Sequence, residues 1–235
     1  MRWMLKGRLA VSLMALLLLA LAGGEAAAMT TANSNLVNLL RNSTSIIKGN
    51  VTLVTDGIDA SGLPYTEVTV EISQTLRGKE SGTYTFRQFG LMSPRLSADG
   101  TKKMLPAPSG FPKYAENDEV LLFLSRPAEV TGLRTTYGLG AGRFSYGPGR
   151  IENDLANEGL FRNVSLEAGL ATSNDVRMLE TEIGAVNPET FQSFVERAVT
   201  ENWVEKCRLW DSIEGKTCPG GTRSGPARVQ KSSVN

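Results

Sequence analysis

The 235-residue sequence contains no histidine. This absence excludes Ser-His-Asp and Cys-His nucleophilic machinery, HExxH zinc sites and acid–base catalysis by imidazole. Carboxylate, lysine or serine chemistry remains open to the chain. Because no catalytic constellation accompanies those residue types, we expect a protein that is not an enzyme and that uses neither a cofactor nor a metal.

Cysteine is almost as rare, since the chain carries only Cys207 and Cys218. Two thiols without any histidine make a poor zinc site. In an oxidising compartment, a pair separated by ten residues can close a local disulfide loop, and free thiols are the alternative. We expect the disulfide. Because it would close only a local loop, the main core must be stable without it.

The sequence has one long hydrophobic run, Leu9–Leu21, preceded by Arg2, Lys6 and Arg8 and followed by the small residues Ala26–Ala28. This order is typical of a secretory signal peptide. The alternative is a membrane anchor, but the 13-residue run is shorter than the roughly 20 residues that span a bilayer. We therefore expect a signal peptide at residues 1–28, a secreted or periplasmic protein, and no membrane anchor after cleavage.

An excess of charge of one sign is also missing. Residues 1–28 carry three basic residues and one acidic residue, so their removal leaves 22 basic and 23 acidic residues. A near-neutral chain has no electrostatic case for binding nucleic acid or anionic membranes. The remaining 207 residues suit one domain of ordinary size with a peripheral extension.

The chain is rich in β-strand patterns. Ser45–Gly78 alternates apolar and polar residues on both sides of a loop at Asp56–Pro64, which predicts a hairpin with one packed face; Gly49 marks a bulge or a close backbone approach. Thr83–Phe89 predicts a third strand. Val120–Leu124 is apolar at every position, which predicts a strand covered on both faces, with a helix packed outside.

Further elements follow from similar patterns. Leu133–Leu139 and Arg143–Tyr146 predict two more strands, and Asn33–Asn42 predicts a short amphipathic helix. Asn187–Asn202 has an N-cap, a first-turn proline and an apolar stripe, which predict a helix that packs on the core. Five or six short strands and a long helix indicate a mainly β protein with a small antiparallel barrel or sandwich.

Two fragments suggest catalysis. Ser45–Lys48 matches the S-x-x-K signature of serine–lysine enzymes, but the serine enters a predicted strand, whereas that chemistry places it at a helix start. Glu67 and Glu71 project from the same face of one strand, and a pair of acids is what glycoside hydrolysis requires. A solvated outer face explains the two acids equally well.

The segment Gly90–Pro112 is the main candidate site, because a loop of more than twenty residues in a compact domain is usually functional or disordered. Its apolar side chains either fold back on the domain or make an exposed contact surface, and the sequence does not choose between them. The candidate binding residues are Leu91, Met92, Arg95, Leu96, Met104, Leu105 and Phe111.

The succession Ile46–Val51, Tyr65–Val70, Leu76–Gly78 and Asp118–Leu124 resembles a group of poorly characterised secreted bacterial proteins. More distantly, it is similar to the OB-fold barrel of netrin-like domains and of tissue inhibitors of metalloproteinases. The resemblance covers about residues 36–146 and implies an OB-like β-barrel. Those inhibitors chelate the protease zinc through an N-terminal cysteine, which this chain lacks, so that mechanism does not transfer.

Pattern and resemblance together divide the chain into four segments. These are the signal peptide at 1–28, an OB-like β-barrel domain at 33–186, a C-terminal helix with the disulfide loop at 187–218, and a tail at 219–235. The tail is rich in Gly, Pro, Ser and basic residues, and we expect it to be disordered.

The leading functional hypothesis is a binding module for an unknown protein or extracellular ligand, acting through residues 90–112. A secreted protease inhibitor that uses the same loop is the first alternative. A hydrolase that uses Glu67 and Glu71 is the second.

Overall fold

The computed structural model describes residues 34–96, 100–101, 103–104 and 106–213. The predicted signal peptide, the predicted disordered tail, Leu105 and Cys218 lie outside these residues, so the Cys207–Cys218 disulfide stays a prediction. Within the described part of the chain, no helix is both long enough and apolar enough to cross a membrane.

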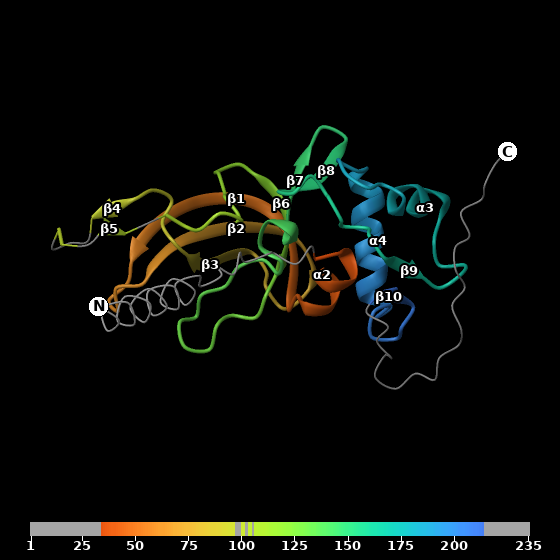
Figure 1. Ribbon diagram of the computed structural model, residues 1–235, viewed down its shortest axis with the longest axis horizontal. Helices are drawn as coiled ribbons and strands as arrows, with labels where there is room; N and C mark the ends of the chain where they lie inside the picture. Colours follow the sequence, from red (N-terminus) through yellow and green to blue (C-terminus); the bar gives the residue numbers. More distant parts are fainter. Residues whose placement is uncertain (1–33, 97–99, 102, 105, 214–235) are drawn as a thin grey trace, which may run out of the picture. The chain divides into compact units, whose positions relative to one another are not determined.

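The protein is mainly β. A six-stranded antiparallel sheet has the order β3-β2-β1-β6-β7-β8, and two small sheets pair β9 with β10 and β4 with β5 (Figure 1). The strands are β1 (Ser45–Ile58), β2 (Pro64–Arg77), β3 (Thr83–Phe89), β4 (Arg95–Leu96), β5 (Lys103–Met104), β6 (Glu119–Leu124), β7 (Arg143–Gly147), β8 (Arg150–Asn153), β9 (Val164–Leu166) and β10 (Leu209–Asp211).

The predicted hairpin of β1 and β2 is confirmed. β1 pairs with β2 along its whole length and with β6 along its first part, and three register shifts interrupt the pairing with β2. One shift lies at Gly49, where an added Cβ atom would stand 2.2 Å from the carbonyl oxygen of Glu71. Only glycine admits this close approach of two strands, as the sequence predicted.

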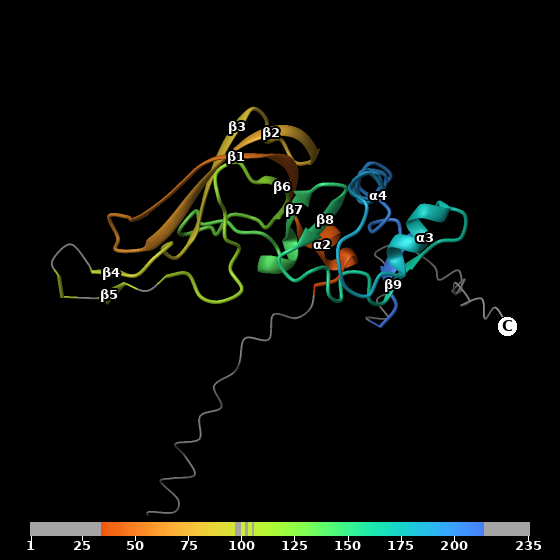
Figure 2. The same ribbon diagram turned by 90° about the horizontal axis from the view of Figure 1, so that it is seen from above.

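The apolar strand β6 is buried on both faces, which confirms the prediction for Val120–Leu124. Leu121 and Phe123 pack in a cluster with the helices, whereas Val120, Leu122 and Leu124 pack in a second cluster formed by the sheet itself. The second cluster is enclosed by the curvature of the β1–β2–β3 meander (Figure 2). The sheet therefore separates two hydrophobic cores.

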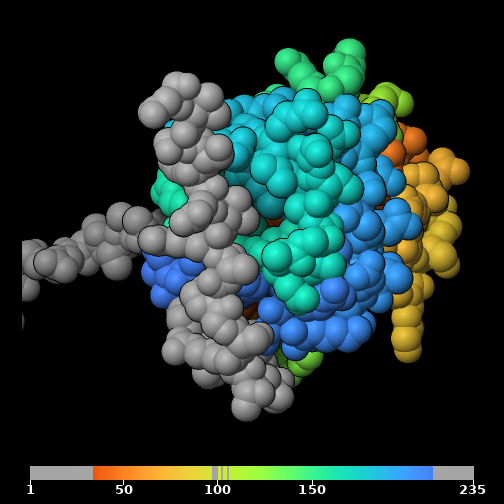
Figure 3. All heavy atoms as spheres, turned by 90° about the vertical axis from the view of Figure 1, so that its right-hand side faces the viewer, coloured from red at the N-terminus to blue at the C-terminus, as the bar shows by residue number. Residues whose placement is uncertain are grey.

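Three α-helices cover the first core: α2 (Leu36–Asn42), α3 (Ser173–Leu179) and α4 (Pro188–Thr200). In α4, the side chain of Asn187 accepts a hydrogen bond from the Thr190 amide, and the predicted apolar stripe packs on the core. The residues of α3 and α4 form much of the face shown in Figure 3, in cyan and blue. The predicted helices at 33–42 and 187–202 are therefore confirmed, with slightly different ends.

Other elements differ from the predictions. Leu133–Leu139 is not a strand: within it Thr136 forms an isolated bridge with Leu124, and Gly138 and Leu139 adopt positive φ angles of 69° and 54° where a 3-10 helix, η1 (Leu139–Gly142), begins. Sequence patterns also missed α3, β8, β9 and β10. The strands β3 and β8 at the two ends of the sheet do not pair with each other, so the described strands do not form a closed barrel.

Replacement of Phe123 by alanine tests the two-core arrangement. The side chain is fully buried and its ring lies 5.5 Å from that of Phe144. We expect Phe123→Ala to lower the free energy of unfolding by about 3–5 kcal/mol, measured by urea denaturation. The control Ile183→Ala removes a side chain that is 61% exposed and should change it by less than about 0.5 kcal/mol. A loss below about 1 kcal/mol for Phe123→Ala would contradict this packing.

Candidate functional site

Residues 90–112, called the arm below, leave the end of β3 and carry the short hairpin of β4 and β5. The arm lies beside the turn that joins β1 to β2, at the end of the sheet away from α3 and α4 (Figures 1 and 2). Gly90–Leu91 at its start and Pro106–Ala107 on its returning part contact each other and form a neck.

Backbone contacts fix the neck to the sheet. The Gly90 amide donates to the carbonyl oxygen of Pro64 at 3.0 Å, and the Thr66 hydroxyl donates to the carbonyl oxygen of Gly90 at 2.8 Å. Leu91 forms a bridge with Pro106, and its carbonyl oxygen accepts from the Ala107 amide at 3.0 Å. Since Leu91 is also buried, the arm leaves the domain from a defined position.

Side chains hold the arm further along its course. The Asp56 carboxylate accepts a hydrogen bond from the Met92 amide at 2.7 Å and forms an ion pair with Arg95. At the end of the returning segment, the Gln88 amide group donates to the carbonyl oxygen of Pro112 at 2.8 Å. The sheet therefore orients both halves of the arm.

The predicted binding residues divide into two groups. Leu91 is buried in the neck, Phe111 is half-buried beside Phe89, and Arg95 pairs with Asp56. By contrast, the side chains of Met92 and Leu96 are 55% and 63% exposed. Met104 is half-buried opposite Arg95, and Leu105 lies outside the described residues. The interpretation that apolar side chains fold back on the domain therefore describes Leu91 and Phe111. The interpretation of an exposed contact surface describes Met92 and Leu96.

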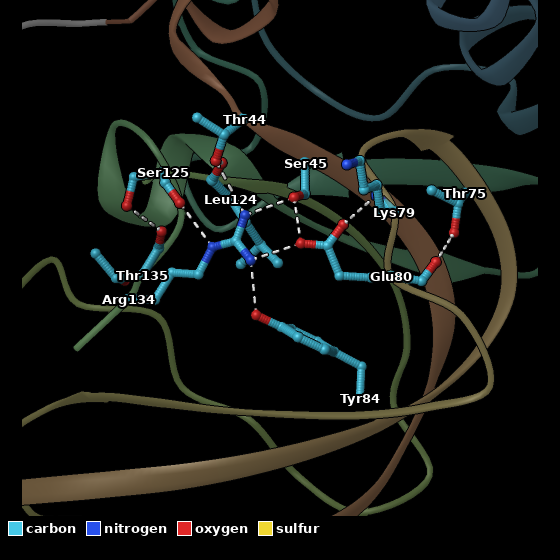
Figure 4. Close-up of polar contacts among 10 residues, drawn as sticks. All are labelled: Thr44, Ser45, Thr75, Lys79, Glu80, Tyr84, Leu124, Ser125, Arg134 and Thr135. Atoms are coloured by element: carbon cyan, nitrogen blue, oxygen red, sulfur yellow. Dashed lines mark hydrogen bonds and ion pairs between the residues drawn. The ribbon is translucent and has the colours of Figure 1, made fainter. Parts of the chain in front are cut away.

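A buried arginine organises a second polar cluster, which no sequence pattern indicated. Arg134 belongs to the connection from β6 to β7 and contacts the start of β1 and the turn between β2 and β3, and its side chain is 5% exposed (Figure 4). Its guanidinium donates to the Ser125 carbonyl oxygen at 2.6 Å, Glu80 Oε1 at 2.8 Å, Tyr84 Oη at 2.6 Å, Thr44 Oγ1 at 3.0 Å and Ser45 Oγ at 2.5 Å.

These contacts engage all five donor positions of the guanidinium, which leaves none for a ligand. Burial by itself raises the pKa of Glu80, but hydrogen bonds from Arg134 and Ser45 outweigh it and lower the pKa to about 2. Glu80 is therefore negatively charged near neutral pH and balances the charge of Arg134. The cluster ties three separate segments together and is structural.

The S-x-x-K fragment belongs partly to this cluster. Ser45 contacts Arg134 and Glu80, whereas Lys48 pairs with Glu119 at 3.2 Å and lies 4.3 Å from the centre of the Tyr146 ring. The hydroxyl and the amine thus have different partners. This arrangement gives no support to serine–lysine catalysis.

The carboxylates Glu67 and Glu71 are poorly placed for glycoside hydrolysis. Glu67 forms an ion pair with Arg87 at 2.6 Å, and the guanidinium of Arg87 lies over the Tyr65 ring. Residues four apart in a strand are separated by about 13 Å, whereas paired glycosidase carboxylates lie roughly 5–9.5 Å apart. Glu71 is exposed, as expected for a solvated outer face.

The surface of the described residues includes two open depressions of similar size. One, of about 390 Å³, lies between α3 and the start of α4 and includes Arg177 and Thr190. The other, of about 350 Å³, lies along β3 beside the connection from β6 to β7. Among the described residues, no cluster of three or more acidic or cysteine side chains could hold a metal ion.

The chain was compared with protein-family models, with curated proteins and with solved structures, and none of these comparisons gives a match.

Replacement of Gly90 tests how the neck is fixed. Gly90 has a φ of +100°, and an added Cβ atom would stand 2.4 Å from the Cα atom of Ala107. We expect Gly90→Ala to separate the two strands of the neck and to speed amide hydrogen exchange at Ala107 at least tenfold. Gly100→Ala is the control, because Gly100 also has a positive φ but open space around it. Equal exchange in the two variants would contradict the proposed role of the close contact.

The lowered pKa of Glu80 predicts a pH-dependent contribution to stability. A carboxylate whose pKa falls on folding stabilises the native state above its ordinary pKa of 4.5, and the effect fades as the pH falls toward 2. We expect Glu80→Gln to cost on the order of 2 kcal/mol of unfolding free energy at pH 7. The difference from the wild type should shrink by pH 2.5. Glu71→Gln is the control, and a difference for Glu80→Gln that stays constant with pH would contradict the expectation.

Proposed function

We propose that this protein is an exported, non-enzymatic binding module that contacts its partner through Met92 and Leu96 of the arm, which are called the tip below. The observation that carries the proposal is the contrast between the fixed neck and the exposed apolar side chains of Met92 and Leu96. The proposed partner is a protein or another extracellular ligand. Export rests on the sequence of residues 1–28.

The energetics of the tip support an interaction role. Burial of a large aliphatic side chain stabilises a complex by about 1.5–3 kcal/mol before the cost of association is included. Because Asp56 holds the Met92 amide and Gln88 holds Pro112, the backbone at the base of the arm loses little conformational entropy when a partner binds. A preorganised loop with exposed apolar groups is a common form of recognition surface.

We also infer that the sheet is an open form of the OB-like barrel expected from the sequence. The order β3-β2-β1-β6 agrees with that topology. Between β3 and β6 runs the segment 133–137, in which the Arg134 amide donates to the Arg87 carbonyl oxygen at 2.7 Å and Thr136 bridges to Leu124. These contacts support the inference that the segment stands in place of a closing strand. The proposed relationship to secreted bacterial proteins and to netrin-like domains rests on the same arrangement and on the sequence resemblance.

A secreted protease inhibitor remains the alternative use of the same arm. It differs from the leading proposal in having a protease as the partner. Titration of the protein against secreted metalloproteases and serine proteases separates the two, since inhibition at micromolar protein that is lost in Leu96→Ser supports the alternative. The hydrolase alternative has no comparable support, because Glu67 is paired with Arg87.

Site-directed photo-crosslinking tests the leading proposal. A benzophenone amino acid at position 96, in protein returned to the cell envelope and medium of its source, should give a specific adduct. The same group at position 183, where the native isoleucine is 61% exposed, is the matched control. Unlabelled wild-type protein should suppress the adduct at least tenfold better than the double variant Met92→Ser, Leu96→Ser.

The double variant should unfold at the wild-type temperature, because both side chains are more than half exposed. No adduct at position 96, or equal adducts at 96 and 183, would overturn the assignment of the arm as the binding surface.

A further inference from the structure

The depression beside β3 runs along the edge of that strand. Four consecutive residues of β3, Tyr84–Arg87, line it on one side. Side chains alternate between the two faces of a strand, so a depression on either face would contact only every second residue. The opposite wall is formed by Pro127, Thr131 and Gly132 in the connection from β6 to β7.

Hydrogen bonds around β3 determine which backbone groups point into this groove. The Ile72 amide donates to the Gly82 carbonyl oxygen, and the Gly90 amide donates to the Pro64 carbonyl oxygen, so the even-numbered residues of β3 face β2. The carbonyl oxygen of Arg87 faces the other way, since it accepts from the Arg134 amide at 2.7 Å. By the same alternation, the N–H and C=O groups of Thr83 and Thr85 point away from β2, and those of Thr85 lie along the groove.

The edge of β3 is open at these positions. In the described part of the chain, no backbone hydrogen bond reaches Thr83 or Thr85 from outside the sheet. The segment Thr83–Phe86 contains no proline, no charged residue and no bulge, which are the usual devices that protect an edge strand from pairing. A buried ring, Phe86, and two threonines make it a regular β-strand.

We propose that the groove binds an extended peptide segment, which adds to the sheet as a strand beside β3. The unpaired donors and acceptors of Thr83 and Thr85 supply main-chain hydrogen bonds to the peptide. Residues Pro127, Thr131 and Gly132 line the other side of the groove, opposite β3. The contact between Arg134 and Arg87 closes one end.

Main-chain hydrogen bonds position the peptide beside β3, and the side chains that line the groove select among peptide sequences. Arg87 is engaged by Glu67, and every donor of Arg134 is already used. Because Arg134 has no free donor, Arg87, whose side chain is 48% exposed, is the arginine of the groove that can contact the peptide, and the main chain supplies the rest of the affinity. This site is separate from the arm and does not depend on the function proposed for it.

Selection from phage-displayed random heptapeptides tests the proposal. The immobilised wild-type protein should enrich peptides that bind in solution, and Thr85→Pro should weaken that binding at least tenfold because it removes the amide donor. Thr85→Ala is the matched control, since it changes the side chain and keeps the amide. Proline is tolerated on an edge strand where its nitrogen faces away from the partner strand, and circular dichroism verifies that the variant is folded.

A second measurement does not rely on the protein variant. Single N-methylation along the best selected peptide should abolish binding at alternate positions, the pattern expected of a strand that pairs along one edge. The proposal is overturned if no peptide is enriched, if binding survives Thr85→Pro in folded protein, or if N-methylation has no alternating effect. Sedimentation that reveals a dimer lost in Thr85→Pro, without peptide binding, would assign the edge to a second copy of the chain.

Discussion

The burial of β6 on both faces is the constraint on which the arrangement of the protein depends. Every side chain from Val120 to Leu124 is apolar and inaccessible to water, so each side of this strand needs its own cover. The helices α2 and α4 supply it on one side. On the other side, β1 and β2 must curve over the strand, and the close approach at Gly49 is part of that curvature.

Buried guanidinium groups connect the segments that this curvature brings together. Arg134 joins the start of β1 to the connection after β6, while Arg143 on β7 pairs with Asp118 at 2.5 Å and with Asp154 at 2.7 Å. Burial raises the pKa of Asp154, and the charge of Arg143 opposes that rise. Both arginines are compensated by acidic groups, which is the condition under which a protein tolerates a buried charge.

Sequence patterns predicted the helices and strands in which apolar residues follow one regular pattern along the whole element. The alternation in β1 and β2, the apolar run of β6 and the capped stripe of α4 each identify an element without knowledge of its neighbours. The prediction of a strand at 133–139 was wrong because the segment does not pair along one neighbour. Arg134 bonds to Arg87 of β3, whereas Thr136 bridges to Leu124 of β6. The Arg134 cluster was equally unpredictable, since Glu80 and Arg134 are 54 positions apart and only the folded sheet brings them together. The length of the segment 90–112 identified it as a candidate site. Only the structure distinguishes its fixed neck from its exposed tip.

The way the arm is attached has an evolutionary consequence. Main-chain atoms and Thr66 hold its neck, and Asp56 and Gln88 hold the residues next to it, Met92 and Pro112. Residues at the tip therefore contribute little to folding, and selection can change them without loss of the scaffold. Related chains that share this sheet could diverge quickly at Met92 and Leu96 while they keep Gly90, and a foreign recognition sequence could be grafted between the two strands of the neck.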